Sequence, residues 1–220
     1  MKLSPRHLFI LVPLGVFLVG GALYGLVYGL PAAATDFSSL KARDEVERMR
    51  DGKKRMPALA EWARLRRSLE RAAASAPDNA QILDDIAFLY AFRALSMDGV
   101  AELADLRREM FAEAAGYYRR AAPLRPMFPY TWAQLALADH YADGDEQEMW
   151  SAFDKALAYG HNEGSVQLML AEIAFARWSA LEPKRAAAIV EMVDQAPEAL
   201  QKPLLEVAER YVVKLPGLGR

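Results

Sequence analysis

The sequence contains no cysteine and only three histidines among its 220 residues. Without cysteine, the chain can form no disulfide framework, no thiolate zinc site and no thiol nucleophile. His7 precedes a long apolar run, and His140 and His161 stand more than twenty residues apart, so the spacing of metalloprotease ligands is missing. A glycine-rich phosphate loop and a nucleophile-elbow motif are also absent from the sequence. We therefore expect a protein that is not an enzyme and that binds no cofactor and no metal.

Strand-forming patterns are scarce as well. Alternating Val, Ile and Thr nearly disappear after residue 35, while Ala, Leu, Glu and Arg are abundant, a composition typical of helices. The apolar content of 53% is ample for one sizeable core. Residues 36–71 hold 11 Lys/Arg against 7 Asp/Glu, and residues 72–220 hold 14 against 22. Because basic residues of this acidic body are scattered among carboxylates, we expect no nucleic-acid partner.

One long uncharged segment lies near the N-terminus. Residues 8–30 are 23 positions without a formal charge, preceded by Lys2 and Arg6. At 1.5 Å per residue, a helix of this length crosses a hydrocarbon layer of roughly 30 Å. A cleaved signal peptide is the alternative, with a cleavage site at the alanines of residues 32–34, but its apolar region is usually only about 7–15 residues long. We predict an uncleaved transmembrane signal-anchor helix over residues 8–30.

The flanking charges predict the orientation of this helix. Lys2 and Arg6 favour a cytoplasmic N-terminus over residues 1–7, since positively charged flanks tend to remain inside. Basic residues beyond position 40 oppose this assignment in a wider window, although large domains translocate despite such charges. We therefore predict a single-pass protein of the bacterial inner membrane with a periplasmic body.

A glycine stripe runs along the predicted span. Gly21, Gly25 and Gly29 recur every fourth residue, and such small residues allow a second helix to approach closely. Glycine is also common in membrane spans generally, and Gly15 and Gly20 lie off the stripe. Two interpretations stay open, a packing contact that could form a homodimer and ordinary span composition.

Residues 31–56 form a charged stem. A helix is expected over residues 38–50, ending at Asp51 and Gly52. We interpret the stem as a solvated, flexible connector. Its basic run, residues 53–55, could instead contact anionic lipid headgroups.

From Pro57 onward, turn residues interrupt helical periodicity at regular distances. Apolar residues at offsets 6, 9, 10 and 13 after Pro77 are Leu83, Ile86, Ala87 and Tyr90. The first three offsets after Pro126 are occupied by Trp132, Leu135 and Ala136. Intervals of 49, 35 and 36 residues separate the equivalent positions Ala72, Ala121, Ala156 and Met192.

This pattern resembles the tetratricopeptide repeat, a pair of antiparallel helices of about 34 residues closed by a proline turn. The resemblance covers residues 57–197, and the 49-residue interval carries an insertion of about 15 residues. Asp139 departs from the pattern at a usually aromatic position, and Met192 at a small one. The resemblance implies an all-α fold, a short solenoid of helix pairs with a C-terminal capping helix and tail over residues 198–220.

Turn residues and periodicity together predict the helix boundaries. The insertion should lengthen the helix that begins near Val100 by about four turns, or the 79–95 hairpin that leads into it. The predicted helices cover residues 57–75, 79–95, 100–124, 129–142, 145–159, 163–179, 183–195 and 198–214.

The acidic residues 139–148 are the nearest approach to a metal site. A calcium loop needs oxygen ligands at fixed spacing, but Tyr141 and Trp150 occupy two of the ligand positions. We therefore interpret residues 143–145 as a turn, with Asp145 capping the next helix.

In tetratricopeptide-like solenoids, partner peptides lie along a concave surface lined by the first helix of each pair. Exposed aromatic side chains there would bind a peptide or helix. Alternatively, the inserted residues 96–110 or the stem fold over these side chains and bury them, which we favour slightly for Phe88 and Phe92. The resemblance implies a candidate partner groove of Asp84, Phe88, Phe92, Tyr130, Leu137, His140, Tyr141, Leu168, Glu172 and Phe175.

The order of anchor, stem and degenerate solenoid, with PMFPYTWAQLA at residues 126–136, loosely resembles small accessory proteins of bacterial exopolysaccharide production and export. This resemblance implies a non-catalytic scaffold or adaptor that binds protein partners of an envelope complex. An assembly factor for a pilus, secretion or cytochrome-maturation complex is the alternative. A polysaccharide-modifying enzyme would need convergent groups, for which Asp84, His140 and Glu172 are the plausible trio.

Overall fold

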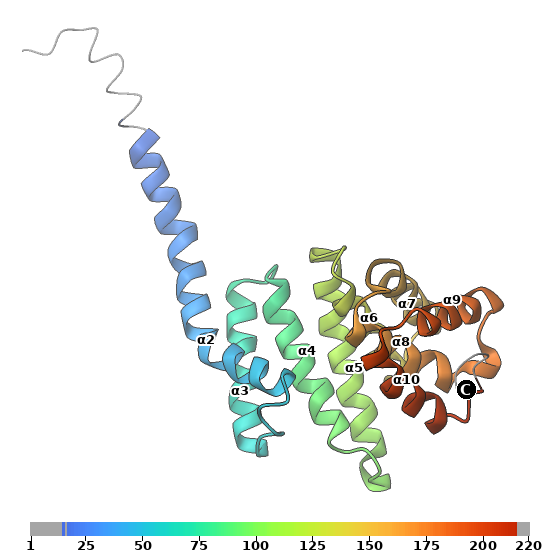
Figure 1. Ribbon diagram of the computed structural model, residues 1–220. Coiled ribbons are helices and arrows are strands. Elements are labelled where there is room, and N and C mark those ends of the chain that lie inside the picture. The colour runs from blue at the N-terminus through green and yellow to red at the C-terminus, as the bar shows by residue number, and fades with distance from the viewer. Residues whose placement is uncertain (1–14, 16, 215–220) are drawn as a thin grey trace, which may run out of the picture.

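The computed structural model describes Gly15 and residues 17–214 (Figure 1). Within this part of the chain the regular elements are all helical, so the all-α prediction is confirmed. The elements are η1 (Gly25–Gly29), α2 (Leu30–Arg50), α3 (Leu59–Ser75), α4 (Ala80–Leu95), η2 (Ala101–Leu103), α5 (Ala104–Ala121), η3 (Ala122–Leu124), α6 (Pro129–Ala142), α7 (Glu146–Gly160), α8 (Gly164–Ala176), η4 (Trp178–Ala180), α9 (Pro183–Asp194) and α10 (Glu198–Arg210).

Local signals explain the boundaries of these helices. The side chain of Asn79 accepts a hydrogen bond from the backbone N–H of Ile82 and thereby caps α4. Asp145 caps α7 through the N–H of Glu148 at 2.8 Å. The predicted helix over residues 100–124 is a central α-helix, α5, with short 3-10 turns at both ends.

Successive helices pack on one another around one core. Contacts join α4 to α5, α5 to α6, and α6 to α7 and α8, and α8 also contacts α9 and α10. The core cluster extends from α2 to α10. Fully buried alanines, among them Ala121, Ala133 and Ala156, occupy positions where helices meet. Their small side chains allow the helix backbones to approach closely.

Helix α2 is longer and more firmly packed than the sequence predicts. It begins at Leu30 rather than near residue 38, and it contacts α3 and α4. Ser39, Ala42, Val46 and Met49 are buried along one face of its C-terminal half. The interpretation of the stem as a flexible connector is therefore wrong for residues 39–50, because four buried side chains at helical spacing attach them to the body.

The N-terminal helix projects away from the body (Figure 1). Residues 17–24 are helical, and the π-helical turn η1 joins them to α2. Within the described part of the chain, no helix combines the length and the apolar character needed to cross a membrane. Residues 1–14 and 16, which include much of the predicted span, lie outside the described residues, as do residues 215–220. The span stays a prediction.

Candidate partner-binding surface

The predicted groove residues come from α4, α6 and α8. Asp84, Glu172 and Phe175 are buried, and the other seven residues of the set are half-buried. Since none of the ten is exposed, the set does not form an open aromatic surface. The alternative of burial therefore describes most of these side chains.

The stem covers the part of the predicted groove on α4. The rings of Phe88 and Phe92 stack with centroids 5.3 Å apart. The guanidinium of Arg50, at the end of α2, lies 4.9 Å from the centroid of Phe88. This cation–π contact and the packing of α2 hold the stem over the pair.

The inserted segment covers Tyr141. Arg107, within the inserted residues 96–110, lies 4.9 Å from the Tyr141 ring centroid. Phe111, one turn later in α5, stacks on the same ring at 4.8 Å. Helix α5 thus closes the end of the predicted groove near the C-terminus of α6.

Glu172 joins α6, α8 and the C-terminal helix. Its carboxylate accepts hydrogen bonds from the hydroxyls of Tyr141, at 2.9 Å, and Tyr211. Arg210 forms an ion pair with it at 2.9 Å. Burial raises the pKa of Tyr141 well above its usual range, and the neighbouring Glu172 carboxylate raises it further. Tyr141 is therefore a protonated donor that connects helices, and replacing it would disturb the fold.

His140 has a structural partner as well. Its Nδ1 accepts a hydrogen bond from Nε of Arg177 at 3.1 Å. Burial lowers the pKa of His140, and the nearby charge of Arg177 lowers it further, so the ring is neutral at pH 7.

The three groups considered for catalysis do not converge. Asp84 bonds Thr131 in the first turn of α6, at 3.0 Å. His140 lies in the last turn of α6, nine residues and about 13 Å further along the axis. Glu172 bonds the residue after His140, so the trio is divided between the two ends of α6.

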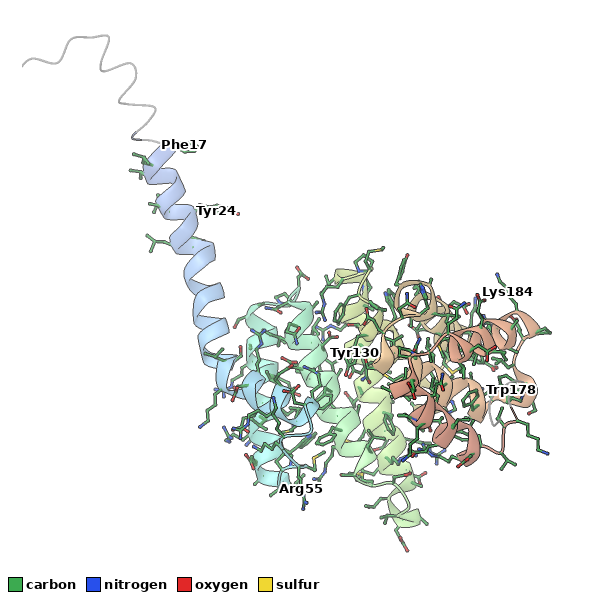
Figure 2. All side chains as sticks on the ribbon, in the orientation of Figure 1. Phe17, Tyr24, Arg55, Tyr130, Trp178 and Lys184 are labelled. Atoms are coloured by element: carbon green, nitrogen blue, oxygen red, sulfur yellow. The ribbon has the colours of Figure 1, made fainter. Side chains whose placement is uncertain are left out.

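One part of the predicted groove remains open, around Tyr130. A pocket of about 300 Å³ is lined by Tyr130, Phe128, Asp84, Gln81, Arg50, Glu47 and Glu163. The rings of Tyr130 and Phe128 are tilted, with centroids 6.3 Å apart. Tyr130 lies near the middle of the body in Figure 2.

Two buried carboxylates support this pocket. Asp84 accepts hydrogen bonds from Arg125 and Thr131, which joins α4 to the start of α6. Asp85 is 2% exposed and pairs with Arg50 at 3.1 Å. Burial raises the pKa of Asp85, and the Arg50 guanidinium opposes that shift. These ion pairs fix the rims of the pocket.

The predicted turn at residues 143–145 is present between α6 and α7. Asp143 adopts a left-handed conformation with φ of 51°. The N–H of Gly144 donates to the carbonyl of Asp139 at 2.9 Å, which closes the C-terminus of α6. Across the described residues, no group of three or more potential His, Asp or Glu ligands is placed to hold a metal ion.

The glycine stripe is only partly described. Gly21 and Gly25 are exposed, with open space where a Cβ would stand. Gly25 and Gly29 bound the π-helical turn, so their relative direction differs from the α-helical geometry that the prediction assumed. A helix–helix contact through these glycines stays a prediction.

Besides the Tyr130 pocket, an exposed apolar surface lies at the tip of the α4–α5 hairpin. The sequence did not lead us to predict it. Figure 1 shows this tip, residues 95–106, at the end of the body opposite the N-terminal helix. Leu103 and Leu106 are one helical turn apart and 36% and 40% exposed. Leu95 and Val100 are 47% and 42% exposed. The inserted segment contains apolar residues at helical spacing, and this pattern could have predicted the exposed surface.

Acidic side chains surround this apolar tip. Asp98 is 72% exposed and Asp105 is 87% exposed, although each pairs with an arginine of α5. Glu102 is exposed as well. An apolar groove with a basic rim on a partner would complement this surface.

Comparison with models of known protein families, with curated proteins and with solved structures finds no match.

Proposed function

We propose that this protein is a non-catalytic, membrane-anchored scaffold that holds protein partners of a bacterial envelope assembly. The observation that carries the proposal is the exposure of the N-terminal helix. Phe17, Leu18, Val19, Leu23 and Val27 are between 56% and 77% exposed. In Figure 2, Phe17 and Tyr24 lie on the helix clear of the body. A helix that is apolar on all sides needs an apolar environment, and a bilayer supplies one.

The body suits a scaffold of tetratricopeptide-like helix pairs. Helix α6 packs against α7 to form a pair, and α6, α8 and α10 contact one another in succession. Stacked first helices of this kind produce an extended solenoid with surfaces for binding partners. Two surfaces are available for protein partners, the Tyr130 pocket and the hairpin tip.

We assign the assembly to exopolysaccharide biosynthesis or export, with the N-terminus in the cytoplasm and the body in the periplasm. This assignment is supported by the order of anchor, stem and solenoid and by residues 126–136. The proposal includes no cofactor.

Crosslinking in native membranes tests the proposal, with full-length protein as bait. The tip variant carries Leu103→Ser and Leu106→Ser, and the pocket variant carries Tyr130→Ala. Leu59→Ser and Tyr159→Ala are matched controls, because Leu59 is 60% exposed, Tyr159 is 45% exposed, and neither lines the Tyr130 pocket or belongs to the hairpin tip.

We expect polymerase or export components to crosslink to the wild type and both controls, and to be lost from the tip or pocket variant. Capture of pilus, secretion or cytochrome-maturation components would retain the scaffold and change the pathway. Equal capture by all variants would exclude both surfaces as docking sites. Capture of the bait alone would contradict the scaffold and favour self-association through the glycine stripe.

A further inference from the structure

The connection between α5 and α6 has unusual surface properties. Its residues 122–128 include three large apolar side chains within five positions. Leu124 and Phe128 are each 41% exposed and Met127 is 67% exposed. Clustered exposed apolar side chains on a soluble surface mark a site of interaction.

This connection is held in place by the body. The indole Nε1 of Trp132 donates to the carbonyl of Pro126 at 2.9 Å. The guanidinium of Arg125 lies 4.5 Å from the Phe128 ring centroid and pairs with the buried Asp84. Pro129 begins α6 directly afterwards. The exposed side chains are thus presented by a fixed backbone.

The position of the connection indicates what it contacts. Figure 1 shows the α3–α4 and α5–α6 connections at the end of the body towards which the N-terminal helix projects. The predicted span ends at Leu30, and Ser39 is already buried against the body. Ser39 is nine positions after Leu30, or about 13 Å along the helix. The headgroup region of one leaflet is roughly 5–8 Å thick, so a bilayer around residues 8–30 would bring its headgroups close to this end of the body.

The charges at this end suit a lipid surface. Arg120, in the last turn of α5, and Arg71, near the end of α3, are exposed. Asp78 is the one acidic residue of the two connections, residues 76–79 and 122–128, and Glu47 and Glu163 line the Tyr130 pocket beside Phe128. Apolar side chains next to arginines are the composition of interfacial membrane contacts.

We propose that residues 122–128 are a lipid-contact loop, which places Leu124 and Met127 in the headgroup region of the membrane that holds the N-terminal helix. The inference rests on the proposed anchor. It adds a second point of attachment, which restricts rotation of the body about the stem and directs the hairpin tip away from the membrane.

Site-specific fluorescence tests the contact, and the absence of cysteine makes each introduced thiol unique. Met127→Cys, Leu23→Cys and Val100→Cys are labelled separately with an environment-sensitive fluorophore in the full-length protein. Leu23 reports the anchor, and Val100 is the control at the opposite end of the body. The labelled proteins are reconstituted in vesicles of phosphatidylethanolamine and phosphatidylglycerol, with nitroxide quenchers on the headgroup or at a mid-chain carbon.

We expect headgroup nitroxides to quench the label at residue 127 at least twofold more than the label at residue 100. The label at residue 23 should be quenched best by mid-chain nitroxides. Quenching at 23 with equal weak quenching at 127 and 100 would overturn the lipid-contact loop while retaining the anchor, and would favour a protein partner for this loop. Absence of quenching at 23 would overturn the anchor and the loop together.

Discussion

At the scale of single residues, Asp139 is the one carboxylate of α6, and its environment is strongly perturbed. It is 3% exposed, and its Oδ1 pairs with Arg119 at 3.1 Å. Its Oδ2 is buried with no hydrogen-bond partner among the described residues. Burial raises the pKa of Asp139 to about 6, although Arg119 opposes the shift. The charged form is therefore less stable in the folded protein than in the unfolded chain.

This raised pKa predicts a dependence of stability on pH. A carboxyl whose folded pKa exceeds its unfolded value stabilises the fold fully below the unfolded pKa and loses that effect as pH rises through the folded pKa. We expect Asp139→Asn to remove a fall in the free energy of unfolding between about pH 4 and pH 6.5, of at most about 3 kcal/mol. Urea unfolding of both proteins across this range measures it.

The pH dependence of the free energy of unfolding must be compared between Asp139→Asn and the wild type, because a second group titrates in this range. The pKa of His140 is lowered in the folded protein, so this residue makes the folded state more stable as pH rises over the same range. That effect partly cancels the effect of Asp139. Identical pH slopes in the two proteins would show that Asp139 is ionised normally.

Trp132 is predicted to stabilise the fold rather than to bind a partner. It is 8% exposed, donates to the carbonyl of Pro126, and has Lys155 Nζ 4.0 Å from its ring centroid. Trp132→Ala should lower the free energy of unfolding by about 3–5 kcal/mol, because it leaves a cavity in the core. Thermal and urea unfolding measure this loss, and Trp132→Phe should recover part of it. A loss below about 1 kcal/mol would contradict a core role.

At the scale of elements, α2 is both stem and part of the core. Its buried face contacts α3 and α4, while Arg50 pairs with Asp85 across 35 positions of sequence. Arg43, also on α2, pairs with the same carboxylate at 3.6 Å. Helix α2 therefore fixes the direction of the N-terminal segment relative to the body.

A matched pair of substitutions tests this docking. Val46→Asp places a charge at a fully buried position, and Leu40→Asp places one on the same helix at a position 59% exposed. We expect Val46→Asp to release residues 39–50 from the body, with at least tenfold faster amide hydrogen exchange there, because an unpaired buried charge is costly. Leu40→Asp should leave exchange unchanged. Equal exchange in the two variants would mean that α2 is not docked in solution.

At the scale of the whole molecule, the two ends of the body have different surfaces. The end beside the N-terminal helix carries Leu124, Met127 and exposed arginines, whereas the opposite end carries the acidic and apolar hairpin tip. A protein held in this orientation would present its tip to partners away from the membrane.

Membrane retention tests the anchor directly. Leu18→Arg together with Leu23→Arg adds two charges near the middle of the predicted span, each costing about 2.5–3.5 kcal/mol at the centre of a bilayer. We expect this variant to leave the membrane fraction in alkaline carbonate, while Leu18→Ala with Leu23→Ala remains. Retention of both variants would exclude insertion of this helix as the means of attachment.

The sequence by itself determined the helical class and nearly every helix boundary in the body. Periodicity, capping by Asn79 and Asp145, and proline turns act within a few neighbouring residues, so a linear pattern contains them. The turn at residues 143–145 was predictable for the same reason. The Tyr130 pocket includes a residue of the predicted groove, but its rims on α2 and at Glu163 were not foreseen.

Only the tertiary structure decided which of the predicted groove residues are covered. Tyr141 bonds Glu172 across 31 positions, and Arg210 reaches the same carboxylate across 38. The placement of Arg50 over Phe88 likewise depends on how α2 docks. Exposure depends on the packing of helices distant in sequence, whereas helix formation depends on local spacing, and this physical difference separates what the sequence predicts from what the fold decides.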